Sequence, residues 1–214
     1  MVFSSTPSRE VACVVLAAGS SRRMGSHNKL LLPYRGMPMI RQVVLQAVAS
    51  NCTRVIVVLG HNAPEVEQAL VGLSVQFVPN AKHAQGMGHS VAVGVSEVPD
   101  TVGVLICLGD MPRVNAATLN ALMDAYQLDD NIEICRPRYK GQPGNPILWG
   151  PSFFPALSRL QGDEGARGIL QAHSADIRWV DVETDGVLQD VDQPEDLPAM
   201  GMALPRSKDG ALAS

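Results

Sequence analysis

Apolar runs of strand length recur along the chain and alternate with segments of helical periodicity. Residues 11–18, 54–60 and 102–108 form the longest of these runs, and valine is frequent in all of them. A run that is apolar at every position is typical of a strand that is buried on both faces of a parallel sheet. We therefore predict buried strands at these positions, and shorter strands over residues 75–78 and 132–136.

Segments with a helical spacing of apolar residues lie between these strands. The spacing predicts helices over residues 38–48, 63–70 and 86–98. Asn115 is a suitable N-cap for a further helix, in which the apolar residues of 119–126 share one face. The alternation of strands and helices predicts an α/β fold of three layers, in which a doubly wound, mostly parallel sheet lies between two layers of helices.

The last third of the chain has a less regular pattern. Residues 146–149 are expected to form an edge strand, and residues 177–182 alternate like a strand. Residues 153–160 and 164–173 are expected to form two short helices, with Asp163 as the N-cap of the second. The chain shows no internal repeat, and none of its turn-rich stretches is long enough to separate two domains.

The length suits one large α/β domain or two small ones, and the lack of a separating linker favours one. With 214 residues, of which 46% are hydrophobic and 18% are charged, the chain can bury a substantial core. We expect a single domain over residues 1–200, with a flexible lead at 1–10 and a loose tail at 201–214. The net charge of -4 argues against a nucleic-acid partner, because non-specific nucleic-acid binding needs a basic surface.

The cysteines and the first residues bear on the cellular setting. The four cysteines are widely separated and form no C-x-x-C pair, so we expect neither a disulfide framework nor a zinc site. Cys13 and Cys107 fall within apolar runs and are expected to be buried thiols. The N-terminal stretch lacks the apolar core of a signal peptide, and no apolar run is long enough to span a membrane. We therefore expect a soluble, cytoplasmic protein without a membrane partner.

The residues that follow the first strand are suited to phosphate binding. Gly19, Ser20 and Ser21 allow backbone N–H groups to approach a phosphate closely, and Arg23 and Lys29 add full positive charge. The stretch has neither the spacing of a Walker loop nor the second glycine of a dinucleotide fingerprint. From the residues alone, it is either a nucleotide phosphate loop or an ordinary strand-ending loop with solvated arginines.

Polar residues stand at the predicted carboxyl ends of two further strands. Asn80 follows the third strand and Asp110 follows the fourth, so both are expected in one cleft with the first loop. A carboxylate at Asp110 can be a ligand of Mg²⁺, which uses one or two carboxylates together with phosphate oxygens. Asp190 and Asp192 form a second acidic element. The alternatives are a turn aspartate at 110 and a helix-entry cap at 190–192.

Several ordered motifs resemble the MobA-like nucleotidyltransferases, which include the molybdenum cofactor cytidylyltransferases and guanylyltransferases. The sequence LAAGSSRRMG, with Lys29 in the following NKLLLP, is similar to the signature loop of the family. The segments GDMP at Asp110 and DVDQPED at Asp192 also match the family pattern. The LAAG form, with Ala18, is similar to the cytidylyl branch. The resemblance covers nearly the whole chain, from residue 11 to about residue 197.

The resemblance implies a nucleotide-diphospho-sugar transferase-like fold of the Rossmann type, and it implies roles for individual residues. Arg23, Lys29 and Asp110 would be catalytic, and Asp110 and Asp192 would hold a Mg²⁺ cofactor. Asp190 is favoured as a structural residue, although the sequence alone does not separate it from Asp192 as the second metal ligand. The implied nucleotide-binding residues are Leu16, Ala17, Ala18, Gly19, Ser20, Ser21, Arg23, Lys29, Asn80, Gly86 and Ser90.

Two later motifs, PGNP and GDEGAR, are similar to family segments on the acceptor side of the site. Asn145 and Arg167 are the implied acceptor-binding residues, and Asn145 replaces the histidine that is usual in the family. Arg167 is the candidate contact to an acceptor phosphate. The alternative for this second motif is a surface arginine with Asp163 as an ordinary N-cap.

By this resemblance, the protein transfers CMP from CTP to molybdopterin, the organic part of the molybdenum cofactor, and releases pyrophosphate. Its partners would be the nucleotide, the phosphorylated acceptor and, transiently, molybdoenzymes or cofactor-delivery proteins. A GTP donor, or a phosphosugar, phosphopolyol or phospholactate-like acceptor, would keep the same chemistry with another specificity. A nucleotide-binding module, or a redox relative that acts on a nitrogen heterocycle, is the alternative from another functional class.

Overall fold

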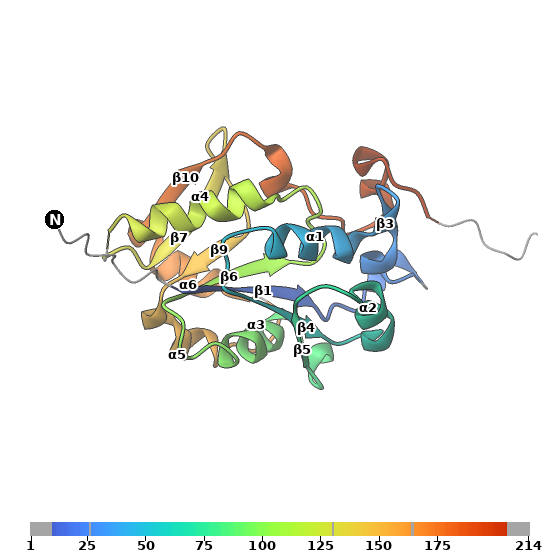
Figure 1. The fold of residues 1–214 in the computed structure, drawn as a ribbon, viewed down its shortest axis with the longest axis horizontal. Coiled ribbons are helices and arrows are strands. Elements are labelled where there is room, and N and C mark those ends of the chain that lie inside the picture. Colours follow the sequence, from blue (N-terminus) through green and yellow to red (C-terminus); the bar gives the residue numbers. More distant parts are fainter. Residues whose placement is uncertain (1–9, 26, 130, 164, 205–214) are drawn as a thin grey trace, which may run out of the picture.

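The structure, a computed structural model, describes residues 10–25, 27–129, 131–163 and 165–204. Most of the expected lead and tail therefore lies outside the described residues. The main element is an eight-stranded sheet with the order β10-β7-β9-β6-β1-β4-β5, and with β8 paired to β7 (Figure 1). The strands are β1 (Val11–Ala17), β4 (Arg54–Leu59), β5 (Gln76–Pro79), β6 (Gly103–Leu108), β7 (Ile134–Tyr139), β8 (Gln142–Pro143), β9 (Ile147–Trp149) and β10 (Ile177–Asp181), together with a separate ribbon of β2 (Pro33–Tyr34) and β3 (Met37–Pro38).

Strand β1 lies in the interior of the sheet, between β4 and β6, and runs parallel to both. All its residues are buried, as expected for a run that is apolar on both faces. Cys13 and Val15 belong to the core cluster on one face of the sheet, whereas Ala12 and Val14 belong to the cluster on the other face. Because successive side chains of a strand point to opposite faces of the sheet, β1 contributes to the core on both faces.

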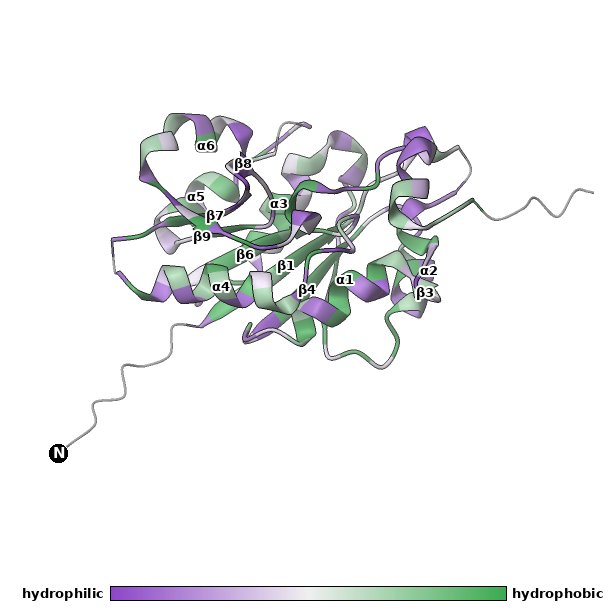
Figure 2. Ribbon diagram, turned by 90° about the horizontal axis from the view of Figure 1, so that it is seen from above, coloured by the Kyte–Doolittle hydropathy of each residue, from purple (hydrophilic) through white to green (hydrophobic). Residues whose placement is uncertain are grey.

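Helices cover both faces of this sheet (Figure 1). α1 (Met39–Val48) and α4 (Ala116–Gln127) pack on one face, whereas α3 (Met87–Ser96) and α5 (Phe154–Leu157) pack on the other. Figure 2 shows apolar strands in the interior and polar residues on the outer surfaces of the helices. The expected three-layer, mostly parallel α/β fold is thus confirmed. The other helices are α2 (Ala63–Ala69), α6 (Arg167–Ala172) and the short 3-10 helices η1 (Arg22–Met24), η2 (Lys29–Leu31), η3 (His83–Gln85), η4 (Pro151–Phe153), η5 (Ser174–Asp176), η6 (Asp185–Leu188), η7 (Pro194–Asp196) and η8 (Pro198–Met200).

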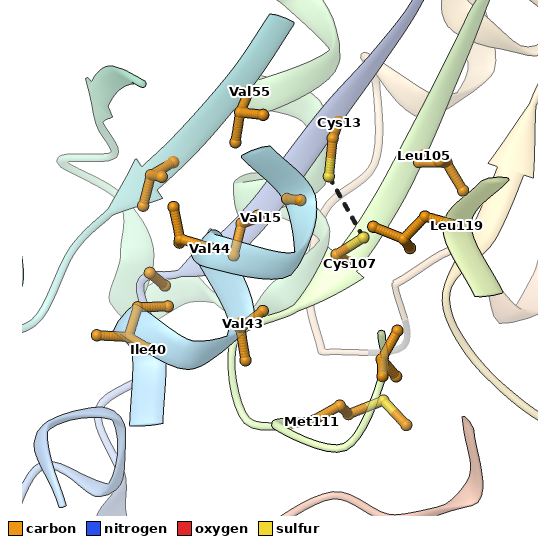
Figure 3. Close-up of a cluster of buried hydrophobic side chains, with 14 of the residues drawn as sticks. Cys13, Val15, Ile40, Val43, Val44, Val55, Leu105, Cys107, Met111 and Leu119 are labelled. Atoms are coloured by element: carbon orange, nitrogen blue, oxygen red, sulfur yellow. Dashed lines mark hydrogen bonds between the residues drawn. The ribbon is translucent and has the colours of Figure 1, made fainter. Parts of the chain in front are cut away.

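The core between the sheet, α1 and α4 contains Cys13, Cys107 and Cys135, and Figure 3 shows the first two of them. The Sγ atoms of Cys13 and Cys107 lie 3.4 Å apart on the neighbouring strands β1 and β6, and both residues are free thiols. Both are buried, as the sequence predicts, among side chains such as Val44 and Leu119. The hydrogen bond with Cys107 and burial in the core raise the pKa of the Cys13 thiol. The pair is therefore part of the core packing.

The edge position predicted for residues 146–149 is wrong. β9 lies inside the sheet, antiparallel to both β6 and β7, and β10 forms the edge instead. Leu148 and Trp149 are almost fully buried, so both faces of β9 are covered. An apolar run predicts a strand, but it carries no information about the neighbours of that strand.

The helix predicted over residues 164–173 begins later than expected. α6 starts at Arg167 with Ala166 as its N-cap, so Asp163 does not cap it, and residue 164 itself lies outside the described residues. Gly162 and Gly165 take left-handed φ angles of 70° and 56°, which bend the chain before the helix can start. No helix in the described part of the chain is long and apolar enough to cross a membrane.

The strand predicted over residues 132–136 is displaced toward the C-terminus. β7 covers Ile134–Tyr139 and includes the polar sequence RPRY. Its arginines find partners outside the core, because Arg136 donates to the carbonyl of Gly144 at 3.0 Å and Arg138 donates to both carboxylate oxygens of Asp181 at 2.6 and 2.9 Å. These contacts extend the strand beyond the apolar pattern that predicts it.

Candidate active site

A cleft of about 390 Å³ opens where β1 and β6 end. It gathers residues from the first loop, from the start of α3, from the end of β6 and from the acidic segment near residue 192. The expectation that strand ends meet in one cleft is therefore met for the first loop and Asp110. The lining residues are Leu16, Ala18, Gly19, Ser20, Ser21, Arg22, Arg23, Lys29, Leu30, His83, Ala84, Gly86, Met87, Ser90, Leu108, Gly109, Asp110, Asp163 and Asp192.

The first loop is closed by a side-chain contact between its two ends. Ser21 Oγ donates to Asn28 Oδ1 at 3.5 Å and accepts from the backbone N–H of Lys29 at 3.1 Å. Asn28 Oδ1 also accepts from the N–H of Leu30, which caps η2. Ser21 takes a left-handed φ of 48°, and the buried side chain of Met24 anchors the loop to the core. This arrangement fixes the backbone from which Lys29 extends.

Lys29 joins the two carboxylates of the cleft. Its Nζ donates to Asp110 Oδ2 at 2.6 Å and to Asp192 Oδ1 at 2.8 Å, and only 12% of its side chain is exposed. Arg23 reaches the other oxygen of Asp192 with Nη1 at 3.3 Å, and its side chain is largely exposed. The distance from Lys29 to Asp110 is that of a charge-assisted hydrogen bond.

Backbone contacts fix the positions of both carboxylates. The N–H of Gly109 donates to the carbonyl of Leu16 at 3.0 Å, and a Cβ at Gly109 would lie 2.7 Å from that carbonyl oxygen. The N–H of Val191 donates to the carbonyl of Asp110 at 3.0 Å. The N–H of Asp192 donates to the side chain of Asp196 at 2.8 Å. The end of β6 and the acidic segment are therefore held together by the main chain.

The charges of the cleft shift one another's pKa values. Burial alone would lower the pKa of Lys29, but the charges and hydrogen bonds of Asp110 and Asp192 outweigh burial and raise it. Burial raises the pKa of Asp110, and the attraction of Lys29 acts in the opposite direction. The hydrogen bond from Lys29 lowers the pKa of Asp192. Lys29 is thus firmly protonated, and its charge holds the carboxylates in place.

The two carboxylates fit the requirements of a hard divalent cation that also binds phosphate oxygens. Asp110 Oδ1 is buried and has no hydrogen-bond partner among the described residues, so this oxygen is available as a metal ligand. The described residues hold no cluster of three or more His, Cys, Asp or Glu that could bind a metal alone. A pair of carboxylates completed by phosphate and water is a common magnesium or manganese arrangement.

Asn80 and Ala17 do not line the cleft, although both were implied nucleotide contacts. Asn80 is buried and donates from its side-chain amide to Ser90 Oγ at 3.1 Å, and its Oδ1 accepts from the N–H of Lys82 at 2.9 Å. Asn80 therefore orients Ser90, which does line the cleft. Ala17 points into the core on the face of α1.

Gly162 of the GDEGAR motif packs against the start of α3, beside the cleft. The N–H of Gly88 donates to the carbonyl of Gly162 at 2.8 Å, and a Cβ at Gly86 would overlap with the backbone of Gly162. Gly86 takes a φ of 111°, which only glycine adopts readily. Asp163 lines the cleft. The motif thus supports the start of α3.

Several lining residues could not be picked out from the sequence. His83 and Ala84 are examples, whereas the sequence alone suggests Asp163 only as a helix N-cap. His83 packs on Gly60, where a Cβ would lie 2.6 Å from the Cβ of His83, and its Nδ1 is buried without a partner among the described residues. A single histidine carries no spacing signal, so only the fold brings it into the cleft.

The two implied acceptor residues lie apart. Asn145 lines a second pocket of about 450 Å³, together with Gln142 and Asp190, and Leu108 lines both this pocket and the cleft. Asp190 therefore lines the second pocket, and its negative charge adds to the effect of burial in raising the pKa of Asp110. Arg167 is exposed on α6 and lines neither cavity. An acceptor role for Arg167 stays a prediction.

Comparisons with known proteins agree with these motifs. The family model described as MobA-like NTP transferase domain matches residues 13–177. Nicotine blue oxidoreductase from Paenarthrobacter nicotinovorans is 28% identical over 198 residues, which cover 87% of this chain and 94% of that protein. Purine catabolism protein PucB from Bacillus subtilis (strain 168) is 30% identical over 207 residues, which cover 89% of this chain and 96% of that protein.

Solved structures share the fold over nearly the same length. Rv0371c from Mycobacterium tuberculosis H37Rv superimposes with a TM-score of 0.79 at 29% identity, covering 90% of this chain and 97% of that one. A complex of Rv0371c with manganese superimposes with a TM-score of 0.76 at 29% identity, covering 89% and 97%. A divalent metal is therefore present in at least one solved relative.

Proposed function

The chain belongs to the MobA-like NTP transferase family, and we propose that it transfers CMP from CTP to molybdopterin with release of pyrophosphate. The observation that carries the proposal is the meeting of Lys29, Asp110 and Asp192 beside the first loop, at the ends of β1 and β6. A bound triphosphate needs cations for its oxygens and carboxylates for its metal ion. This cleft offers both.

In the proposed reaction, the attacking group is a terminal phosphate oxygen of the acceptor, which is already anionic near neutral pH. No general base is therefore needed from the protein. A new bond forms between this oxygen and the α-phosphorus of the nucleotide. The bond from the α-phosphorus to the bridging oxygen breaks, and pyrophosphate leaves with the electron pair.

The residues of the cleft contribute position and charge. Arg23 and Lys29 bind the triphosphate and hold it in line with the acceptor. Asp110 and Asp192 would hold Mg²⁺. When bound there, the metal ion would neutralise the negative charge that develops on the leaving pyrophosphate. The backbone of Gly19 to Ser21 would contact the phosphates, and Gly86 and Ser90 would contact the nucleoside.

The first loop and the second pocket bear on the identity of the donor and of the acceptor. The LAAG form with Ala18 supports CTP as the donor, because it resembles the cytidylyl branch. The second pocket, with Asn145 and Gln142, supports an acceptor that presents hydrogen-bonding groups beside the cleft. Because Leu108 lines both cavities, an acceptor in the second pocket would lie next to the nucleotide.

A redox or nucleotide-binding role is the second candidate. The similarity to nicotine blue oxidoreductase favours it, because that relative is named as an oxidoreductase. The pair of carboxylates favours nucleotidyl transfer, and so does the buried Oδ1 of Asp110, which has no hydrogen-bond partner among the described residues. A protein that only binds a nucleotide does not need two carboxylates for a metal ion.

A thermal-unfolding panel separates these candidates. We expect CTP with Mg²⁺ to raise the melting temperature more than GTP, ATP or UTP does, because a ligand that binds only the native state stabilises it. Asp110→Asn is the matched variant and should lose the magnesium-dependent part of the shift. Stabilisation by a redox cofactor, with no response to any nucleoside triphosphate, would favour the second candidate.

A further inference from the structure

The ammonium group of Lys29 occupies the space between the two carboxylates that a metal ion would use. Nζ lies 2.6 Å from Asp110 Oδ2 and 2.8 Å from Asp192 Oδ1, and the side chain is 12% exposed. The other oxygen of Asp192 is bound by Arg23. Of the four carboxylate oxygens, only Asp110 Oδ1 has no partner in the described part of the chain.

Two cations balance the carboxylate pair of this cluster, and Asp190 adds a further negative charge that acts on Asp110. The cations Lys29 and Arg23 face the anions Asp110 and Asp192. A divalent cation that enters this arrangement meets three engaged oxygens and a buried ammonium group a few ångströms away. Like charges at such a distance repel, and most strongly at the Asp110 end, where the side chains of Lys29 and Asp110 are only 12% and 17% exposed. Metal binding to the free protein should therefore be weak.

A triphosphate changes this balance. Its anionic oxygens are better partners for Lys29 and Arg23 than shared carboxylates, because they add charge that the cluster lacks. Lys29 carries its charge on a flexible stem of four carbons, so it can move while its backbone stays fixed by Ser21. Once Lys29 has moved, the oxygens of Asp110 and Asp192 that it held are free for the metal.

We propose that Lys29 is an internal counter-cation that keeps the carboxylate pair closed to divalent metal until a triphosphate draws it away. The proposal rests on the proposed function, because it takes Asp110 and Asp192 as the metal ligands. Metal and triphosphate would then bind as a coupled pair, each improving the affinity for the other. Lys29 is in this sense a positioning residue for the metal as well as a phosphate contact.

The test measures Mn²⁺ binding by the electron paramagnetic resonance signal of the free ion, in the absence of any nucleotide. Lys29→Met keeps the length of the side chain and removes its charge. We expect this variant to bind Mn²⁺ alone about tenfold or more tightly than the wild type. Arg22→Met is the matched control, since Arg22 lines the same cleft but makes no ion pair with these carboxylates. Its Mn²⁺ affinity should stay near that of the wild type.

A second measurement needs no variant and covers the case in which Lys29→Met does not fold. The Mn²⁺ affinity of the wild-type protein is compared with and without inorganic triphosphate, with protein-free Mn²⁺ and triphosphate as the baseline. Coupling predicts about a tenfold or greater gain with triphosphate. Equal Mn²⁺ affinities in both conditions, or in wild type and Lys29→Met, would overturn the inference and leave the metal site intact. No Mn²⁺ binding under any condition would instead overturn the proposed function together with the inference.

Discussion

Asp110 accepts a 2.6 Å hydrogen bond from the side chain of Lys29, a residue 81 positions earlier in the chain. This contact brings the end of β6 to the first loop and places a carboxylate beside the proposed triphosphate site. Asp110→Asn keeps the size of the side chain and removes its charge. We expect the rate of pyrophosphate release to fall about a hundredfold or more, because one charged contact in the transition state is lost.

The control for this change is Asp124→Asn, since Asp124 is exposed on α4. This variant should retain the wild-type rate. Thermal unfolding of both variants establishes that each is folded before the rates are compared. A well-folded Asp110→Asn protein with a near-normal rate would remove Asp110 from the mechanism.

Asp190 and Asp192 should have different effects, because they face different cavities. Asp192→Asn is expected to raise the Mg²⁺ concentration needed for half the maximal rate, since it removes one of the two proposed ligands. Asp190→Asn is expected to raise KM for the acceptor and to leave the Mg²⁺ requirement unchanged. Magnesium titrations of the two variants test this directly. An equal rise in the Mg²⁺ requirement for both would contradict the assignment.

The centre of the fold could be predicted from the sequence because its strands have no polar side. β1, β4 and β6 are buried on both faces, and a continuous apolar run reports that condition directly. The sequence predicts that β9 is a strand but not its position in the sheet. The hydrophobic pattern indicates which residues are buried, and it does not indicate which strands are neighbours. The start of α6 was missed because Gly165 and the residues near it interrupt a helix that the apolar pattern would continue.

Two helical glycines allow a matched test of the packing against the sheet. Gly94, in α3, lies against β1, and a Cβ there would overlap with Cγ1 of Val14. Gly94→Ala should therefore lower the free energy of unfolding by about 1–3 kcal/mol. Gly168, in α6, has open space around it, so Gly168→Ala should be neutral or stabilising by up to about 1 kcal/mol. Urea unfolding of both variants gives the comparison, and an equal effect at the two sites would contradict this packing.

The core thiols should be unreactive in the native protein. Hydrogen bonding and burial raise the pKa of Cys13, and burial raises the pKa of Cys135 to about 12. Because the thiolate is the reacting form, both should be protonated and slow toward a disulfide reagent at about pH 8. All four cysteines should react once the chain is unfolded in urea. Rapid labelling of Cys13 in the native state would show that this part of the core opens.

The candidate site was predictable where residue type and strand position coincide. The fold brings four charged side chains into one cleft, those of Arg23, Lys29, Asp110 and Asp192. Each of them lies near a predicted strand end or within a motif that can be recognised in the sequence. Asn80 carries a polar side chain at a strand end as well, but it turns inward to Ser90. The sequence gives the position of such a side chain along a strand, whereas its direction depends on its neighbours.

The most direct test of the central claim is pyrophosphate release from CTP in the presence of Mg²⁺ and molybdopterin, with the nucleotidyl product identified by mass. The account predicts stoichiometric formation of pyrophosphate and of the cytidylylated acceptor, dependent on Mg²⁺ and largely lost in Asp110→Asn. Formation of the corresponding product from GTP or with another phosphorylated acceptor would correct the specificity and keep the chemistry. An absence of pyrophosphate with every donor and acceptor pair, in a protein that binds metal and is folded, would contradict nucleotidyl transfer.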